Sequence, residues 1–314
     1  MAQLSILSLN CHGFNMGTLC YLRDKCSMFD IMLLQETWLS NESSKKLDDI
    51  SSDFNVIHSS AMENKMHDEY LSGRPFGDTA VLYNKRLPCT LTKLDTNNCR
   101  CTTVKLAFNR NNDLVVSSVY MPYFNGSLDN KLDYENTVGC LQGIVDRNLG
   151  FVFGGDMNVS KLQHNTFYKA VDNFCVFNGM FCLDPVEGSI DYTYHTENNG
   201  HYRLLDHMIV SPCLVTSHKT VSILAEGDNT SDHYAISFLC NIGNIPISEL
   251  RNDTSNFSKL KYQWENADLG NYQSFLSNEL SRITLPLTAL LCNGSCIVTV
   301  QQLLISITKV LYIV

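Results

Sequence analysis

The feature of this chain that most constrains its fold is a series of short apolar runs spread over residues 1–240. Most of the runs are bounded by Asn, Asp, Gly or Ser, residues that favour turns. Short apolar runs with such boundaries are typical of β-strands. We therefore expect strands at 4–9, 31–34, 79–83, 114–121, 151–153, 204–210 and 234–239.

Stretches with helical spacing lie between these runs, at 17–28, 40–50 and 129–148. The longest stretch places Leu132, Val138, Leu141 and Val145 along one face, and Gly150 follows as a stop signal. Strands and helices that alternate along one segment pack together in layers. The pattern therefore predicts an α/β or α+β sandwich.

The sequence changes in character after residue 240. Residues 241–258 are polar and rich in turn formers, which indicates a linker. Residues 259–314 predict a mostly helical tail that stops inside an apolar segment without a cap, as a truncated piece would. Gln301, Gln302 and Lys309 in that segment disfavour a membrane span. The expected organisation is one domain at 1–240, a linker and a tail.

The charge of the chain limits its partners. The formal charge is −9, and residues 241–314 carry equal numbers of basic and acidic side chains, so residues 1–240 hold the whole negative excess. A protein that coats DNA through a basic surface has the opposite balance. Contact with nucleic acid must therefore come from a local site. No sequence segment indicates binding to a protein partner.

The cysteines indicate a reducing compartment. There are 13 of them, irregularly spaced, and the first residues lack the charged and apolar regions of a secretory signal. We expect free thiols and an intracellular protein, cytoplasmic or nuclear, that is not secreted. Cys292 and Cys296 have no second Cys or His pair nearby, so they are expected to be two thiols in preference to a zinc site.

Polar side chains stand at the ends of four predicted strands. LSILSLN ends in Asn10, IMLLQE in Glu36, LVVSSVY in Tyr120, and FVFGGDMN in Asp156 and Asn158. If these strands share a sheet, their C-terminal ends can meet at one rim, where sites on such sheets are usually built. The residue types and their placement therefore predict a polar site at that rim.

The spacing around Asp156 adds detail. Asp156 and Asn158 are two residues apart, which puts both side chains on one face of an extended segment. Gly154 and Gly155 precede them and leave room for another backbone or a substrate.

Each of these residues, taken singly, also has an ordinary structural explanation. Glu36 fits a solvated carboxylate at a strand end. Tyr120 fits a core aromatic, and Asp156 with Asn158 fits a turn after the glycine pair. Coincidence must supply all of them in order, so the combination favours the functional interpretation.

Six short motifs occur in order along the chain: LNCHG (9–13), QET (35–37), VYMPY (119–123), GGDMN (154–158), LLDHMIVS (204–211) and SDHYAIS (231–237). This set resembles the endonuclease/exonuclease/phosphatase superfamily over residues 4–240. Within it, SGRPFGDTAVLYNKRL (72–87) and TSDHYAIS are most similar to the apurinic/apyrimidinic-like endonuclease domains of non-LTR (LINE-type) retrotransposons. The resemblance implies a four-layer α/β/β/α sandwich of the deoxyribonuclease I-like type.

The resemblance also implies a metal site. Glu36 is implied as the principal ligand of Mg²⁺, with Mn²⁺ as the alternative ion, and Asp232 and Asn10 complete or support the site. A hard divalent cation with carboxylate ligands suits phosphodiester hydrolysis because it neutralises charge on the phosphate and the leaving oxygen.

The remaining motif residues are implied to handle water, phosphate and DNA. Asp156 orients or deprotonates the attacking water, and Asn158 holds the water or the phosphate. Tyr120 and His233 donate hydrogen bonds to phosphate oxygens, and Asp206 fixes the His233 ring and raises its pKa. Thr193, in DYTYH (191–195), matches a position that touches DNA in related nucleases.

Two positions depart from the family pattern. His12 stands where apurinic endonucleases usually carry an acidic residue, which favours the retrotransposon relatives over an abasic-site enzyme. Gly77-Asp78 replaces the usual Gly-Gly, so this chain has an added carboxylate at the start of a strand.

We therefore expect a Mg²⁺-dependent endonuclease that nicks one DNA strand and leaves 3′-hydroxyl and 5′-phosphate ends, as members of the superfamily do. Two alternatives remain open. One is a phosphatase or phosphodiesterase that acts on inositol phosphates, nucleotides or phospholipids with the same residues. The other is a catalytically inactive binding module.

Overall fold

The computed structural model of the chain describes residues 3–62, 66–67, 70–71, 77–108, 112–145, 150–161, 165–183, 185, 190–196, 200–214 and 221–242. The chain divides into two compact units, Met1–Arg251 and Asn252–Val314. The predicted helical tail at 259–314 and most of the predicted linker at 241–258 lie outside the described residues, as do Cys292 and Cys296. The following description concerns the first unit.

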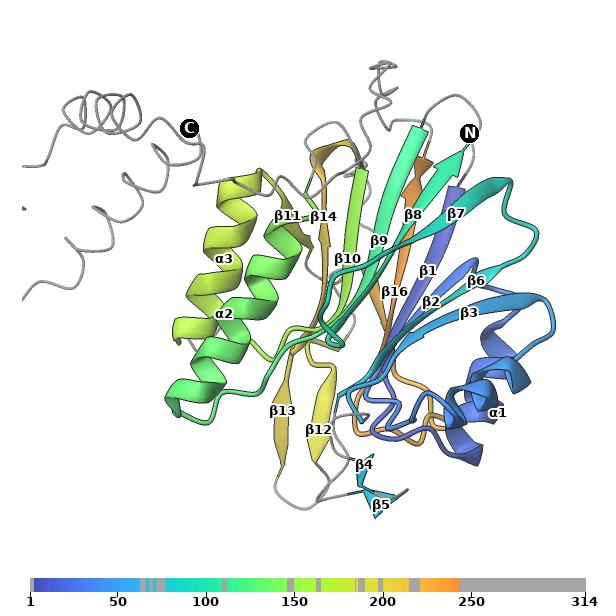
Figure 1. Ribbon diagram of the computed structural model, residues 1–314, viewed down its shortest axis with the longest axis horizontal. Coiled ribbons are helices and arrows are strands. Elements are labelled where there is room, and N and C mark those ends of the chain that lie inside the picture. The colour runs from blue at the N-terminus through green and yellow to red at the C-terminus, as the bar shows by residue number, and fades with distance from the viewer. Residues whose placement is uncertain are drawn as a thin grey trace, which may run out of the picture. The chain divides into compact units, whose positions relative to one another are not determined.

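The first of two large sheets has six strands in the order β15-β16-β1-β2-β6-β3 (Figure 1). β1 runs parallel to β2 and antiparallel to β16, and the other neighbours are antiparallel. The strands are β1 (Gln3–Asn10), β2 (Ile31–Gln35), β3 (Phe54–Ser59), β6 (Thr79–Asn84), β15 (Val221–Leu224) and β16 (Ala235–Asn241).

The second sheet also has six strands, in the order β11-β14-β10-β9-β8-β7. Only β9 and β10 are parallel neighbours in it. The strands are β7 (Cys89–Leu94), β8 (Cys101–Phe108), β9 (Asn112–Tyr120), β10 (Gly150–Asp156), β11 (Phe181–Leu183) and β14 (Asp206–Val210). Two hairpins stand apart, β4 (Met66–His67) with β5 (Tyr70–Leu71), and β12 (Tyr194–Thr196) with β13 (His201–Arg203).

Helices cover the outer face of each sheet. α1 (Met16–Lys25) packs on the first sheet, and α2 (Leu128–Gln142) and α3 (Thr166–Asn178) pack on the second (Figure 1). Two 3₁₀ segments, Ser43–Asp49 and Pro212–Leu214, complete the described helical structure. The predicted four-layer α/β/β/α sandwich is therefore confirmed for this unit.

Side-chain caps define where the helices begin. Asn15 and Asn165 accept hydrogen bonds from the N–H groups of Thr18 and Tyr168, at 3.0 and 2.8 Å. These caps satisfy backbone donors that the first helical turn leaves unpaired. α3 ends at Gly179, whose φ of 63° is the left-handed conformation that glycine adopts at helix ends.

Residue parity decides which side chains lie between the sheets. In β1, Leu4 and Ile6 enter the core between the sheets, whereas Leu7 packs toward α1. In β10, Val152 enters that core and Phe153 packs toward α2 and α3. Because successive strand residues face opposite sides, the even-numbered positions of both strands face the opposite sheet.

A layer of polar contacts follows the apolar core toward one end of the sandwich. Gln35 of β2 donates to the hydroxyl of Ser118 of β9 at 2.9 Å. The hydroxyls of Thr79 (β6) and Thr102 (β8) are 2.8 Å apart. All four side chains are buried, so these bonds link the two sheets where apolar contact ends.

Several local predictions are corrected by the structure. The helix expected at 129–148 ends at Gln142, and Leu132 is 47% exposed instead of lying on the buried face. Tyr134 and Thr137 are buried with Leu141, so the buried face is rotated from the predicted one. The segment expected to be helical at 40–50 contains a 3₁₀ turn. The alternation missed the strands that are partly polar, short or at sheet edges, namely β3, β4, β5, β7, β8, β11, β12, β13 and β15.

The described cysteines are all free, as expected. Within the described ranges, no helix is long and apolar enough to cross a membrane.

Two glycines of β10 allow this strand to pack closely against the first sheet and against β9. A Cβ on Gly154 would meet Leu33 of the first sheet at 2.7 Å. A Cβ on Gly155 would lie 1.9 Å from the carbonyl oxygen of Val119 in β9, and the φ of Gly155 is +152°. The room that the glycine pair was predicted to provide is therefore filled by a neighbouring strand and the opposite sheet.

We predict that Gly155→Ala destabilises the fold by more than about 3 kcal/mol, because the added methyl group clashes with rigid backbone at an unfavourable φ. Gly139→Ala is the matched control. It lies in α2 with nothing within 4 Å of the added Cβ, so the gain in helix propensity is expected to stabilise by up to roughly 1 kcal/mol. Urea unfolding of both variants tests this, and equal stabilities would contradict it.

Candidate active site

The predicted site residues gather where the inter-sheet core ends. Asn10 closes β1, Tyr120 closes β9 and Asp156 closes β10, while Asp206 opens the antiparallel β14. All four numbers are even, as are those of the inward-facing apolar residues of these strands. The site therefore lies at the end of the sandwich where β12 and β13 project, the lower end in Figure 1.

The carboxylate of Asp156 is the centre of this cluster. Its Oδ2 accepts hydrogen bonds from the side-chain amides of Asn10 (3.0 Å) and Asn158 (3.1 Å), and its Oδ1 accepts the backbone N–H of Asn158 (2.9 Å). Burial raises the pKa of Asp156 to about 7, against the positive charge of His233, which lowers it. Asp206 and Glu36 add to the rise.

Glu36 lies on the other side of Asn10. Its two carboxylate oxygens accept hydrogen bonds from the Asn10 amide at 3.2 Å and from the Trp38 indole N–H at 3.1 Å. The Tyr120 hydroxyl also interacts with Glu36. Burial and the neighbouring carboxylates hold the pKa of Tyr120 well above its ordinary value, so its phenol keeps its proton and remains a donor.

His233 and Asp206 form a buried ion pair. Nδ1 of His233 is 2.7 Å from Oδ2 of Asp206, and Nε2 is 4.0 Å from Oδ2 of Asp156. Burial alone would lower the pKa of His233, but the charge and hydrogen bond of Asp206, with Asp156 and Asp232, raise it to about 10. His233 therefore carries positive charge at neutral pH.

Asp232 is paired with His12. Nδ1 of His12 is 2.6 Å from Oδ1 of Asp232, and the His12 ring packs edge-on against Trp38 with ring centroids 5.0 Å apart. The hydrogen bond to Asp232 raises the pKa of His12. Burial works against ionisation of Asp232, but the two histidines lower its pKa overall. The departure at position 12 thus places an imidazole beside a predicted metal ligand.

Thr193 is fully buried and supports the backbone of the site through hydrogen bonds. Its hydroxyl oxygen accepts the backbone N–H groups of Leu205 and Asp206, both at 3.1 Å. The N–H of Tyr234 donates to the Thr193 carbonyl at 2.6 Å. These bonds fix the backbone that carries Asp206. Direct contact of Thr193 with substrate stays a prediction, and this geometry does not favour it.

Asp78, the second departure, supports the loop that carries Glu36. Its side chain accepts the backbone N–H of Ala61, and its carbonyl accepts the N–H of Glu36 at 3.0 Å. Burial raises the pKa of Asp78 to about 6, and the nearby backbone N–H groups of Ala61, Leu39 and Trp38 oppose that rise. The added carboxylate is therefore a structural anchor.

Left-handed backbone conformations are concentrated in this region. φ is positive at Asn158, at His12, and at Glu36 and Trp38 in the QETW segment. Non-glycine residues adopt this conformation at a cost of about 1 kcal/mol or more. Such strain persists only where the surroundings hold the backbone in place, as the hydrogen bonds of Asp78 do.

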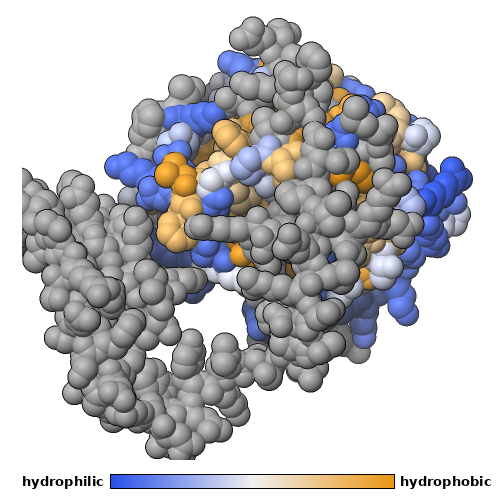
Figure 2. All heavy atoms as spheres, turned by 90° about the horizontal axis from the view of Figure 1, so that it is seen from above, coloured by the Kyte–Doolittle hydropathy of each residue, from blue (hydrophilic) through white to orange (hydrophobic). Residues whose placement is uncertain are grey.

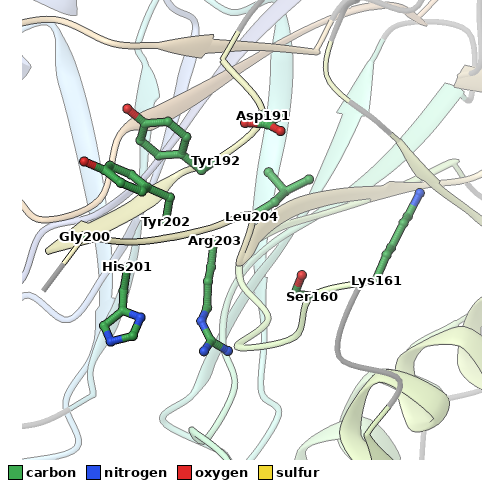
Figure 3. Close-up of a pocket in the computed structure, with 9 residues that line it drawn as sticks. All are labelled: Ser160, Lys161, Asp191, Tyr192, Gly200, His201, Tyr202, Arg203 and Leu204. Atoms are coloured by element: carbon green, nitrogen blue, oxygen red, sulfur yellow. The ribbon is translucent and has the colours of Figure 1, made fainter.

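A groove of about 660 Å³ adjoins the cluster beside the β12–β13 hairpin. Tyr192 and Tyr202 lie side by side at one end, with ring centroids 4.6 Å apart, and Lys161 lies at the other end, with Arg203 between them (Figure 3). Two groove residues lie close in sequence to residues of the site. Lys161 follows Asn158 by three residues, and Arg203 precedes Asp206 by three.

The structure thus brings the predicted residues into one network. A chain of side-chain contacts runs from Glu36 through Asn10 to Asp156 and on to His233 and Asp206. Tyr120 and Asn158 join it directly, whereas Asp232 reaches it through His12 and the charge of His233.

The sequence did not predict the supporting roles of three residues. Trp38 binds Glu36, Asp78 anchors the Glu36 loop, and the Ser231 hydroxyl donates to the carbonyl of Asn10 at 2.6 Å. Trp38 and Ser231 stand within or beside the quoted motifs, so their positions were the available signal.

The profile of the Endonuclease/Exonuclease/phosphatase family matches residues 7–233. A search of curated proteins found no match. Among solved structures, the chain is similar to the endonuclease domain of TRAS1, a telomere-specific non-LTR retrotransposon, with 12% identity and a TM-score of 0.57, covering 79% of this chain and 100% of that one.

Two further structures are similar at comparable levels. The AP endonuclease LMAP from Leishmania major has 14% identity and a TM-score of 0.56, covering 76% of this chain and 88% of that one. The 3′ phosphatase NExo from Neisseria, bound to a product DNA hairpin, has 15% identity and a TM-score of 0.54, covering 76% and 98%. Identities this low show a shared fold.

The His233–Asp206 pair makes stability depend on pH. Because the folded pKa of about 10 exceeds the ordinary value of 6.5, the pair's contribution is complete below pH 6.5 and is lost as pH rises through 10. We predict that the wild-type free energy of unfolding falls by about 3–5 kcal/mol more than that of His233→Asn over this window. Urea titrations in EDTA at a series of pH values measure these free energies of unfolding.

His201→Asn, a substitution of an exposed histidine in the β12–β13 hairpin, is the control and should keep the wild-type slope. Parallel curves for the wild type and His233→Asn would show that the pair is not ionised as described.

Proposed function

Because the chain belongs to the endonuclease/exonuclease/phosphatase family, we propose that it is a metal-dependent phosphodiester hydrolase that nicks DNA and leaves 3′-hydroxyl and 5′-phosphate ends. The observation that carries the proposal is the continuous network from Glu36 through Asp156 to the charged His233, at one end of the sandwich. We assign this activity to residues 1–240.

A Mg²⁺ ion, or Mn²⁺ in its place, is the proposed cofactor, with Glu36 as the principal ligand and Asp232 and Asn10 as its support. The donor set fits, because these side chains offer the carboxylate and amide oxygens that hard cations prefer. Among the described residues no three His, Cys, Asp or Glu side chains form a metal cluster. One or two carboxylates are enough for Mg²⁺, which keeps waters and takes phosphate oxygens. When bound, the ion supplies positive charge at the phosphate and the leaving oxygen.

Asp156 and Asn158 are proposed to handle the attacking water. A carboxylate whose pKa is raised to about 7 is a stronger base than an ordinary aspartate, so it can hold or take the proton of a water. The amides of Asn10 and Asn158 fix its orientation before substrate arrives. Asn158 itself is held by its bond to the carbonyl of Met121 at 2.8 Å.

His233 and Tyr120 are proposed to bind the phosphate from the protein side. Asp206 occupies Nδ1 of His233, so Nε2 keeps its proton and is the donor available to a phosphate oxygen. The high pKa of Tyr120 likewise preserves its hydroxyl as a donor. Both groups are preorganised to stabilise charge that grows in the transition state.

The groove beside the β12–β13 hairpin is the proposed contact with the DNA backbone. Lys161 and Arg203 supply two positive charges against the one carboxylate of Asp191, and Tyr192 and Tyr202 supply ring surface, in a domain that is acidic overall. This is the local site that the overall charge requires. Thr193 is proposed to act here through the buried backbone that it fixes.

The names of the similar structures support DNA as the substrate. An endonuclease domain of a non-LTR retrotransposon, an AP endonuclease and a phosphatase bound to a DNA hairpin share this fold. The motif resemblance favours the retrotransposon type among them, because His12 replaces the acidic residue of abasic-site enzymes.

We predict that the chain relaxes supercoiled plasmid in Mg²⁺, and that ligase reseals the product because its ends are 3′-hydroxyl and 5′-phosphate. Glu36→Ala and His233→Ala should each slow nicking by about 10²-fold or more, since each removes charge stabilisation at the phosphate. EDTA should abolish it. Arg86→Ala, at an exposed turn at the other end of β6, is the control. Equal relaxation by all variants would overturn the residue assignments.

The same preparation distinguishes the alternatives. Faster turnover of inositol phosphates, nucleotides or phospholipids than of plasmid would establish a small-molecule phosphatase or phosphodiesterase. No turnover of any substrate, together with no heat of Mg²⁺ binding in calorimetry, would establish an inactive binding module.

We predict that Arg203→Ala weakens binding of duplex DNA and lowers the slope of log K against log salt concentration by about one, because one phosphate contact is lost. Arg86→Ala should leave both quantities unchanged. Fluorescence anisotropy with labelled duplex, in EDTA across a KCl series, measures them. An unchanged slope for Arg203→Ala would remove the groove from the DNA interface.

A further inference from the structure

A second pocket lies away from the proposed active site, on the outer side of the second sheet. It has a volume of about 210 Å³ and is formed by α3, β11, β14 and the loop after β10. Its lining includes His207, Cys182 and Cys175. At about 30 Å³ per water, this volume corresponds to roughly seven waters, enough for a small reagent.

His207 follows Asp206 in β14 and, as an odd-numbered residue, faces away from the proposed active site. It is 4% exposed, and its Nε2 is 2.9 Å from the carbonyl oxygen of Val159. Because a carbonyl only accepts, Nε2 carries a hydrogen. Nδ1 is therefore left for the hydrogen bond that His207 makes with Cys182.

The two cysteines that line the pocket differ in their surroundings. Cys175, in α3, is buried, and burial raises the pKa of its thiol to about 12. Cys182, in β11, is half-buried and pairs with a histidine. Burial would lower the pKa of His207, but the charge and hydrogen bond of Cys182, with the Val159 carbonyl and Asp206, raise it to about 9. The geometry thus leaves Nδ1 of His207 as the acceptor for the thiol proton of Cys182, in a pocket that both residues line, and a thiol beside such a base is the arrangement that generates a nucleophile.

The mouth of the pocket is open to reagents. Val176 and Phe181, which line it, are 74% and 50% exposed. Figure 2, which looks down on the upper end of Figure 1, shows an orange, hydrophobic group on the side of the molecule where α2 and α3 lie. The other ionisable groups near the pair are Lys161 in the loop after β10, Tyr168 and Asp172 in α3, and Asp206 in β14.

We propose that Cys182 is a reactive thiol, activated by His207 and reached through this pocket, and that it is modified covalently by small soft electrophiles. The thiol proton moves to Nδ1 of His207, and the sulfur attacks the electrophile. With iodoacetamide, a C–S bond forms, the C–I bond breaks and iodide leaves. The imidazolium then returns its proton to solvent.

The test follows the alkylation rate of individual cysteines in the full chain with iodoacetamide, by peptide mass spectrometry between pH 6 and 9. Cys20, which is exposed, and Cys175 are internal references in the same sample. We expect Cys182 to react about tenfold faster than Cys20 at pH 6.5 although it is less exposed, with a rate that changes little up to pH 9. The Cys20 rate should rise steeply with pH, and Cys175 should stay unlabelled.

His207→Gln should slow the labelling of Cys182 at pH 6.5 by about tenfold and restore a steep pH profile, because the proton acceptor is lost. Labelling of Cys175 in this variant would show that the variant is unfolded. The proposal is then tested only by the relative labelling rates of Cys182 and Cys20 in the wild-type protein. Cys182→Ser should remove only the Cys182 signal. The proposal is overturned if wild-type Cys182 reacts more slowly than Cys20 at pH 6.5 or shares its pH profile.

Discussion

The buried carboxylate of Asp156 is the constraint around which the proposed active site is built. It is 1% exposed, and a carboxylate so far from water requires hydrogen bonds and a nearby cation. Asn10 brings an amide from the first sheet, and Asn158 brings one from the following loop. His233, held charged by Asp206, brings the cation. Because these partners come from both sheets, the ionised site exists only when the sandwich is closed.

The close packing of the two sheets depends in turn on glycines and on polar side chains at a few positions. Gly154 and Gly155 allow β10 to approach the first sheet and β9 more closely than any other residue would. The bond between Gln35 and Ser118 then joins the sheets between the apolar core and the site. Along the strands, the apolar core is followed first by neutral hydrogen-bonded side chains and then by the ionised residues of the site. This order lets strand ends carry ionised groups without exposing the core to water.

The sequence predicted the fold class and the family, and both predictions are confirmed, because strand alternation and short motifs act locally. The edge strand β7 has no buried side chain and the β12–β13 hairpin is half-buried to exposed, so neither carries such a local signal. Leu132 was placed on the wrong face because α2 is mostly polar and its periodicity is weak. The order of the site residues was readable, but their contacts were not. Asn10 and Asp156 are 146 residues apart, and only the packing of two sheets brings them together.

The two departures from the family pattern show how a site tolerates change. The added carboxylate of Asp78 accepts the backbone N–H of Ala61, and His12 pairs with Asp232. Glu36 and Trp38 hold left-handed backbone conformations, which cost free energy unless neighbouring bonds fix them. The backbone carbonyl of Asp78 accepts the N–H of Glu36, and the carboxylate of Asp78 ties the same residue to the backbone of Ala61. The proposed ligand is therefore positioned by the protein before any ion or substrate is present, through the Asp78 carbonyl on its backbone and the Asn10 and Trp38 side chains on its carboxylate.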